Sequence, residues 1–122
     1  MRLLIILLLS ILWHTTMEAQ KRETFLYDLE LIEKFKTKSQ WTDKEHEIQK
    51  AHVNYLDSLT NSRKIFLAGI KEQGLKHHTG LVILNVSNYE EAFKIVQNDP
   101  SIKTGMMVGH IKKINIYFLM PE

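Results

Sequence analysis

The segment GLVILNVSNYEEAFKIVQND, residues 80–99, carries the strongest indication of the fold. It begins with branched apolar side chains at both even and odd positions, which predicts a strand covered on both faces in the middle of a sheet. Ser87 or Asn88 then supplies a helix cap, and acidic residues follow in the first turn. The buried stripe of this helix is expected to consist of Ala92, Phe93, Ile95 and Val96. Asp99-Pro100 ends the helix, because a residue before proline avoids the helical region.

Three further segments are expected to form strands. KIFLAGI, residues 64–70, is a short apolar run that precedes the central strand in the sequence. TFLYDLELIEKF, residues 24–35, alternates between apolar and polar positions, which predicts a strand with one covered face. GMMVGHIKKINIYFL, residues 105–119, is long and β-prone. One face of this last strand is expected to carry Ile114, Ile116 and Phe118.

A second helix is expected over residues 43–60. Thr42 and Glu45 have the spacing of a capping box, and Trp41 precedes the cap, where it can pack on His46. At helical spacing, one inward face is formed by Ile48, Ala51, His52, Tyr55, Leu56 and Leu59. A histidine therefore occupies an apolar face where a leucine would be usual.

The predicted order is β-α-β-β-α-β, over a single domain at residues 20–122. Two helices on one face of a four-stranded antiparallel sheet make the ferredoxin-like α+β arrangement. The other face of such a sheet needs cover. In a chain this small a second copy is the natural cover, so we expect a homodimer.

Residues 1–19 have the pattern of a signal peptide. Arg2 precedes an apolar run from Leu3 to Leu12, which is shorter than the roughly 20 residues of a membrane-spanning helix. Cleavage is expected after Ala19. The domain is then exported, to the periplasm or outside the cell, with no stable membrane anchor; an uncleaved anchor is the alternative.

Composition excludes several classes of function. The chain of 122 residues contains no cysteine, so it has no disulfide, no lipid attachment through cysteine and no thiolate zinc site. Its formal net charge is +2, and the basic residues are scattered along the sequence. Proteins that bind nucleic acid usually concentrate their basic residues in a stripe or patch. We therefore expect no nucleic-acid partner.

Over residues 25–118 the chain resembles the YCII-related family, as an exported member within the dimeric α/β-barrel superfamily. The segments that carry the resemblance are WT at 41–42, HVNYL at 52–56, IFLAG at 65–69, GLVILNVSNYEEAF at 80–93 and NDPSIKTGMM at 98–107. The chain departs from the family pattern at Ile70, where relatives are expected to carry arginine or proline. It departs again at Lys76-His77-His78. Both departures lie where a ligand would enter, so the substrate class does not carry over.

This resemblance implies a ferredoxin-like fold and a dimer whose two sheets pack as an α/β barrel. It also implies an active site built on a histidine and an aspartate, which match His52 and Asp99. Related proteins isomerise lactones or eliminate chloride from hydroxylated aromatic rings. Our first hypothesis, which starts from this resemblance, is a lyase or isomerase that uses no cofactor and acts on a small cyclic or aromatic substrate. The alternative is a non-catalytic dimeric protein that binds a ligand or serves a structural role.

The two candidate catalytic residues also have structural interpretations. His52 is either a core histidine bonded to a backbone carbonyl or a general base at the edge of a pocket. Asp99 can cap a short turn that starts at Pro100, and its second oxygen can orient the His52 ring. These two roles of Asp99 are compatible with each other.

Three further residues are predicted to contact the substrate: Tyr55, Gly69 and Gly105. A core tyrosine and two strand-end glycines explain them equally well in structural terms. A third function, binding of a divalent metal by His77 and His78, is a weaker alternative. Adjacent histidines splay apart instead of converging on one ion, so no metal site is expected.

Overall fold

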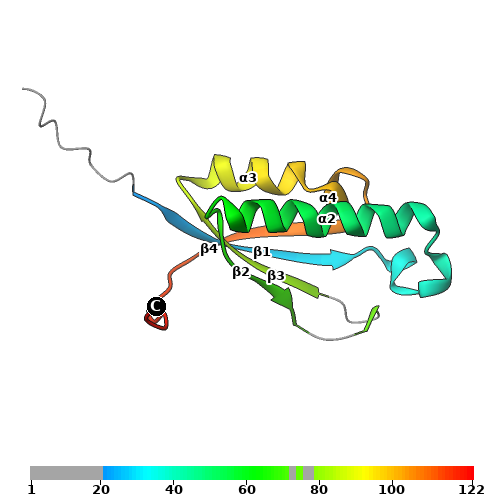
Figure 1. Ribbon diagram of the computed structural model, residues 1–122, viewed down its shortest axis with the longest axis horizontal. Helices are drawn as coiled ribbons and strands as arrows, with labels where there is room; N and C mark the ends of the chain where they lie inside the picture. The colour runs from blue at the N-terminus through cyan, green and yellow to red at the C-terminus, as the bar shows by residue number, and fades with distance from the viewer. Residues whose placement is uncertain (1–20, 72–73, 76–78) are drawn as a thin grey trace, which may run out of the picture.

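The computed structural model describes residues 21–71, 74–75 and 79–122 (Figure 1). The expected signal peptide and the His77-His78 pair lie outside these residues. The elements, in chain order, are β1 (Glu23–Leu31), the 3₁₀ turns η1 (Glu33–Lys36) and η2 (Lys38–Gln40), α2 (Asp43–Asn61), β2 (Ile65–Ile70), β3 (Thr79–Val86), α3 (Tyr89–Asn98), α4 (Pro100–Lys103) and β4 (Met107–Ile114). Within the described part of the chain, no helix is both long and apolar enough to span a bilayer.

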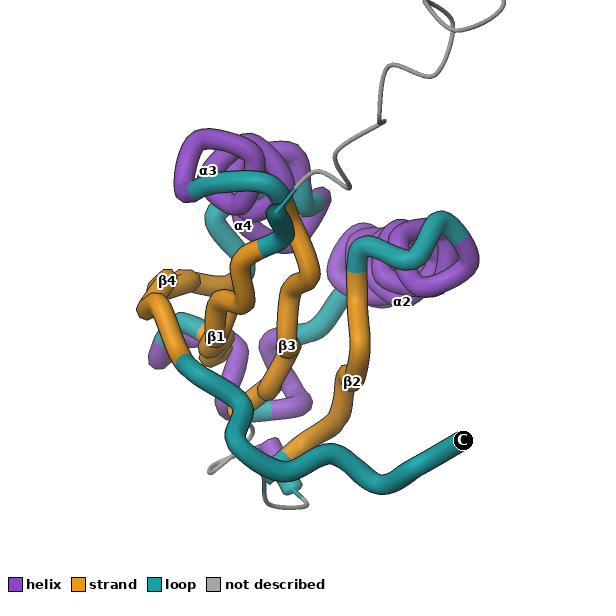
Figure 2. The backbone as a smooth tube through the Cα atoms, turned by 90° about the vertical axis from the view of Figure 1, so that its left-hand side faces the viewer, coloured by secondary structure: helices purple, strands orange, loops and turns teal. Residues whose placement is uncertain are grey.

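The strands form one antiparallel sheet in the order β2-β3-β1-β4. All the helices lie on one face of this sheet, as Figure 2 shows end-on. This is the ferredoxin-like α+β arrangement that the sequence predicts. Strand β3 pairs with β2 on one side and with β1 on the other, so the strand rich in apolar residues at both parities is central, as expected.

The core lies between the sheet and the helices. Alternate residues of β1 point into it, and β3 contributes a matching row from the next strand. The buried residues of these two rows are Phe25, Tyr27, Leu29, Leu31, Val82, Leu84 and Val86. Burial of each large apolar side chain stabilises the fold by about 1.5–3 kcal/mol, so this double row holds the helix layer on the sheet.

Short-range hydrogen bonds fix where the two long helices begin. The backbone N–H of Thr42 donates to Oε2 of Glu45 at 2.9 Å, and the Trp41 and His46 rings pack with centroids 5.3 Å apart. At the start of α3, Oδ1 of Asn88 accepts the backbone N–H of Glu91 at 2.9 Å. The capping box is therefore confirmed, and of the two candidate caps for α3 the structure uses Asn88.

Strands β1 and β4 are shorter than expected. Strand β1 ends at Leu31, because the backbone N–H of Phe35 donates to the carbonyl of Ile32 at 2.9 Å and turns the chain into η1. Strand β4 ends at Ile114, which pairs with Thr24 near the beginning of β1. Beyond that pair β1 offers almost no further partner residues, so the chain continues without regular structure.

Three expectations about which residues share a face are wrong. Ile116 and Phe118 are predicted on one face of the last strand, but both follow the end of β4 and are 41% and 96% exposed. Ala51 is predicted on the inward face of α2, but it is exposed. Phe93 was expected in the buried stripe of α3, but it is half-exposed and stacks on Tyr89, with ring centroids 6.2 Å apart. A ten-residue helix buries only the stripe that faces the sheet, and Phe93 lies beside that stripe.

Candidate functional site

The fold brings His52 and Asp99 together from different elements. His52 lies in the middle of α2, and Asp99 lies between α3 and α4, 47 residues later. Nδ1 of His52 is 2.8 Å from Oδ1 and 2.9 Å from Oδ2 of Asp99. His52 is 6% exposed and Asp99 is fully buried. The partner of the inward histidine is thus a carboxylate and not a backbone carbonyl.

Asp99 also caps α4, as the sequence suggested. Its Oδ1 accepts the backbone N–H of Ser101 at 2.8 Å, and Pro100 occupies the first turn of α4. Proline suits this place, because it has no N–H that would need a partner. The cap fixes the carboxylate on a rigid turn of backbone, and the same carboxylate holds the His52 ring. The two roles of Asp99 therefore coexist.

Two hydroxyl groups complete the shell around Asp99. The Ser101 hydroxyl donates to Oδ1 at 2.7 Å, and the Tyr27 hydroxyl donates to Oδ2 at 3.0 Å. Burial alone would raise the pKa of the Asp99 carboxyl, but the hydrogen bond and charge of His52, with the bonds from Ser101, hold it below its usual range. Burial and the nearby Asp99 charge raise the pKa of Tyr27, so its hydroxyl stays a donor.

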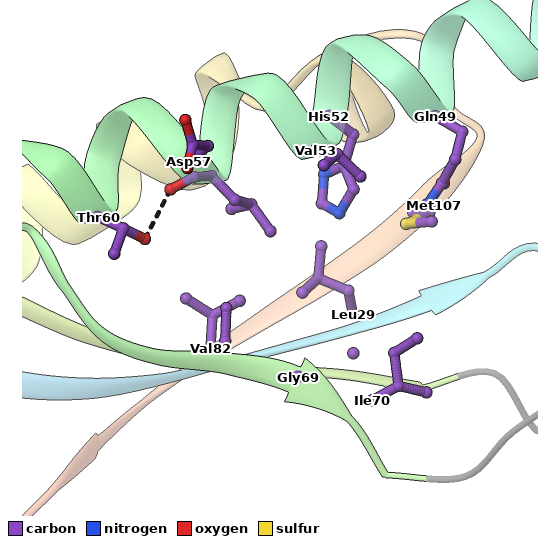
Figure 3. Close-up of a pocket in the computed structure, with 13 residues that line it drawn as sticks. Leu29, Gln49, His52, Val53, Asp57, Thr60, Gly69, Ile70, Val82 and Met107 are labelled. Atoms are coloured by element: carbon purple, nitrogen blue, oxygen red, sulfur yellow. Dashed lines mark hydrogen bonds between the residues drawn. The ribbon is translucent and has the colours of Figure 1, made fainter.

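This arrangement selects one tautomer of His52. An ionised carboxylate can only accept hydrogen bonds, so Nδ1 of His52, which contacts both oxygens of Asp99, must carry a hydrogen. In the neutral ring, Nε2 then holds the lone pair. Figure 3 shows the ring projecting from α2 into the space between the helix and the sheet. The free nitrogen is therefore the one available to a ligand.

A cavity of about 320 Å³ lies between α2 and the sheet, beside His52. Most of its wall is apolar: Leu29, Val53, Leu56, Ala68, Ile70, Val82 and Met107 line it. Its polar side chains come from α2: Gln49, His52, Asp57 and Thr60. An apolar cavity of this size with a few polar groups is typical of a site for a small molecule. Within the described ranges, no cluster of side chains has the composition of a metal site.

The structure separates the three predicted substrate contacts. Gly69 lines the cavity, where a Cβ added to it would meet no atom within 4 Å. Gly105 is not among the lining residues; its φ of 75° identifies it as the glycine of the turn after α4. Tyr55 is also outside the lining, and its hydroxyl donates to the carbonyl of Ile95 at 2.8 Å. For Tyr55 and Gly105 the placement supports the structural interpretation.

Sequence patterns did not identify Tyr27 or Gln49 as site residues, and they indicated Ser101 only weakly. Tyr27 followed the alternation of a buried strand, so it resembled any other core residue. Its ring has room because the neighbouring strand β4 carries a glycine at position 109: a Cβ on Gly109 would lie 2.6 Å from Cε2 of Tyr27. Ser101 had a weak signal, since a serine two residues after a capping aspartate is placed to reach the carboxylate.

Comparison with solved structures finds the same fold in another protein. The chain is similar to 5-chloro-2-hydroxyhydroquinone dehydrochlorinase (TftG) from Burkholderia phenoliruptrix AC1100, solved in complex with 2,5-dihydroxybenzoquinone. The TM-score is 0.58 and the sequence identity 21%, over 75% of this chain and 93% of that one. At this identity the likeness shows the fold alone.

Comparison with sequences gives the family. No curated protein matches the chain at the significance required. The YCII-related domain matches residues 27–115, a range that begins at Tyr27 and contains both His52 and Asp99. Because this match covers most of the chain, the protein belongs to the YCII-related domain family.

Proposed function

We propose that this protein is a lyase or isomerase that needs no cofactor and transfers a proton on a small cyclic or aromatic substrate. One observation carries the proposal: a histidine whose Nδ1 is held by a buried carboxylate lines an apolar cavity. A base oriented in this way by an acidic partner is the usual arrangement for proton abstraction. A histidine with a purely structural role would not need a cavity beside it.

In the proposed reaction, Nε2 of His52 takes a proton from an O–H or C–H group of the substrate. The electron pair left behind forms a new double bond in the substrate. In an elimination, a leaving group such as chloride departs with the electron pair of its bond to carbon, and His52 then releases the proton to solvent. In an isomerisation, His52 returns the proton at another carbon. Asp99 stabilises the positive imidazole ring between these steps, at a distance of 2.8 Å.

The shape of the site supports a compact, largely apolar substrate. The cavity of about 320 Å³ is large enough for one substituted ring, and its wall is mostly aliphatic. The similar dehydrochlorinase acts, by its name, on a chlorinated hydroxyhydroquinone. That name supports elimination as the first reaction to test. Ile70 lines the cavity, so the departure from the family pattern at this position falls on the site itself.

The test measures chloride release from 5-chloro-2-hydroxyhydroquinone and, in parallel, isomerisation of unsaturated lactones. His52→Gln should lower the rate by about 10²–10⁴-fold, the usual contribution of a general base. Asp99→Asn should lower it as well, because an amide cannot stabilise the charged ring. His46→Gln, on the exposed side of the same helix, is the control and should retain full activity. Unchanged turnover in His52→Gln would refute the proposed base, and no turnover of any substrate would favour the non-catalytic alternative.

We also propose that a second copy covers the face of the sheet opposite the helices. Leu67 and Val108 on this face are 54% and 42% exposed, and the apolar segment after β4 leaves the fold on the same side (Figure 2). A sheet with one bare apolar face is incomplete in water. Light scattering should give twice the chain mass for the wild type and a monomer for Val108→Lys. Ala51→Lys, on the exposed side of α2, should stay dimeric. A monomeric wild type would disprove the dimer.

A further inference from the structure

Gln49 is the one side chain of the described residues with a buried polar atom that lacks a partner. It lies on α2 one turn before His52 and lines the same cavity. Its Oε1 is closed off from solvent and accepts no hydrogen bond within the described chain. Figure 3 shows its side chain extending from α2 toward the sheet, on the same side of the helix as the His52 ring. An acceptor left in this state destabilises a fold unless a partner arrives from outside.

Two other polar side chains of the cavity wall each make a hydrogen bond within the chain. Asp57 accepts a hydrogen bond from Nδ2 of Asn61 at 3.2 Å, on the exposed side of the helix. The Thr60 hydroxyl donates to the carbonyl of Leu56 at 2.9 Å. Among the described lining side chains, Gln49 alone has a buried polar atom without a partner, and it lies one helical turn from the free Nε2 of His52.

We propose that Gln49 recognises the substrate by accepting a hydrogen bond from a ring hydroxyl. The inference rests on the proposed function in taking His52 as the reacting group, but the preference for a hydroxyl does not depend on turnover. Side chains three residues apart on a helix lie about 5–6 Å from each other at Cβ. One ring can therefore present its reacting position to His52 and a second substituent to Gln49. The ligand class is a small hydroxylated ring whose remaining surface is apolar, matching Leu29, Val82 and Met107.

The direction of the hydrogen bond follows from which atom lacks a partner. Oε1 is an acceptor, so a hydroxyl satisfies it and a methyl or chlorine at the same place does not. A site built to bond a hydroxyl discriminates strongly against the analogue that lacks one, because the protein group is then left unpaired. Gln49 would thus set which ring positions must carry a hydroxyl.

The experiment compares two probes of equal size, hydroquinone and 4-methylphenol, by NMR titration of the intact domain. Wild type should bind hydroquinone about five- to tenfold more tightly, since the second hydroxyl gains one buried hydrogen bond. Gln49→Met keeps the length and helix propensity of the side chain but lacks the amide, so this preference should disappear. Gln49→Glu restores an acceptor and should restore the preference. Gln97→Met, at an exposed glutamine on α3, is the matched control and should behave as wild type.

Stability gives a second readout that needs no ligand. Because Gln49→Met removes an unpaired buried acceptor, its melting temperature should equal or exceed that of the wild type. Equal binding of the two probes, a preference that survives in Gln49→Met, no binding of either probe at millimolar concentration, or a lowered melting temperature would each overturn the inference. A preference that depends on Gln49 in a protein without turnover would uphold the inference and refute the enzyme. Loss of turnover in His52→Gln, with no effect of Gln49→Met on the preference, would do the reverse.

Discussion

The two long helices cover the same face of one sheet, but they do so in different ways. Helix α3 has ten residues and buries Ala92, Ile95 and Val96 against the strands. Helix α2 has nineteen residues, and apart from Glu45 in its cap only His52 is buried. The rest of its inward face is partly exposed, and the cavity lies beneath it. The shorter helix therefore closes the core, and the longer one frames a site.

The two helices also differ in what they bury. The residues that α3 buries are apolar and pack against the core of the sheet. Under α2 the buried groups are polar, and each of the three groups around Asp99 donates to it: His52, Tyr27 and Ser101. A buried polar network is stable only when its members are satisfied. One buried atom in this region, Oε1 of Gln49, has no partner within the described chain, and this exception points to a ligand.

The largest expected effect on stability comes from truncating a buried apolar side chain of α3, and truncating an apolar side chain of α2 should have little effect. Ile95→Ala on α3 should lower the free energy of unfolding by about 2–5 kcal/mol, because it leaves a void in a packed core. Val53→Ala on α2 should change it by less than about 0.5 kcal/mol, since Val53 is already 53% exposed. Urea denaturation measures both. Equal losses would contradict the difference between the helices.

A pair of glycines sharpens the same contrast. Gly109→Ala would place a Cβ 2.6 Å from the buried Tyr27 ring and should cost about 1–3 kcal/mol. Gly69→Ala at the cavity would meet open space and should leave stability within about 0.5 kcal/mol of wild type. Thermal unfolding of the two variants side by side is the measurement. A stable Gly109→Ala would show that the Tyr27 ring is free to move.

The hydroxyl of Tyr27 can be removed without changing the shape of the core. Tyr27→Phe should lower the free energy of unfolding by about 1–3 kcal/mol, because Asp99 loses one donor in a fully buried place. Tyr55→Phe is the control: its hydroxyl donates to a backbone carbonyl in a partly exposed place, so its loss should cost about 1 kcal/mol or less. A larger loss in the control would place the more important tyrosine outside the Asp99 network.

The last prediction concerns a change in stability with pH, which is expected only in the acid range. The pKa of Asp99 is lowered in the folded state, so the unfolded chain binds the proton more readily. The stability that this carboxylate contributes is therefore complete above its unfolded pKa of about 3.9 and is lost as pH falls through the lower folded value. The stability gap between wild type and Asp99→Asn should narrow over that acid range. Urea unfolding between pH 6 and about pH 3 tests this, and a constant gap would contradict it.

Local sequence was enough to place the main elements and the beginnings of the helices. The caps at Thr42, Asn88 and Asp99 depend on partners two or three residues away, so they could be predicted from the neighbouring residues in the sequence. The central position of β3 followed from apolar residues at both parities. The ends of β1 and β4 could not be found in this way, because they depend on where a distant partner strand stops.

The contacts within the site depend on the tertiary structure. The His52–Asp99 pair was expected from the family resemblance, but its contact of 2.8 Å joins residues 47 positions apart. The Tyr27 hydroxyl reaches Asp99 across 72 positions, and Tyr55 reaches a backbone carbonyl across 40. Because the two residues of each contact lie on different elements, no periodicity within one helix or strand predicts these contacts. From the sequence alone, the fold and the histidine on an apolar face could be predicted. The packing of α2 over the sheet sets which groups contact that histidine and which atom of Gln49 is left for a ligand, because these contacts join residues far apart in the chain.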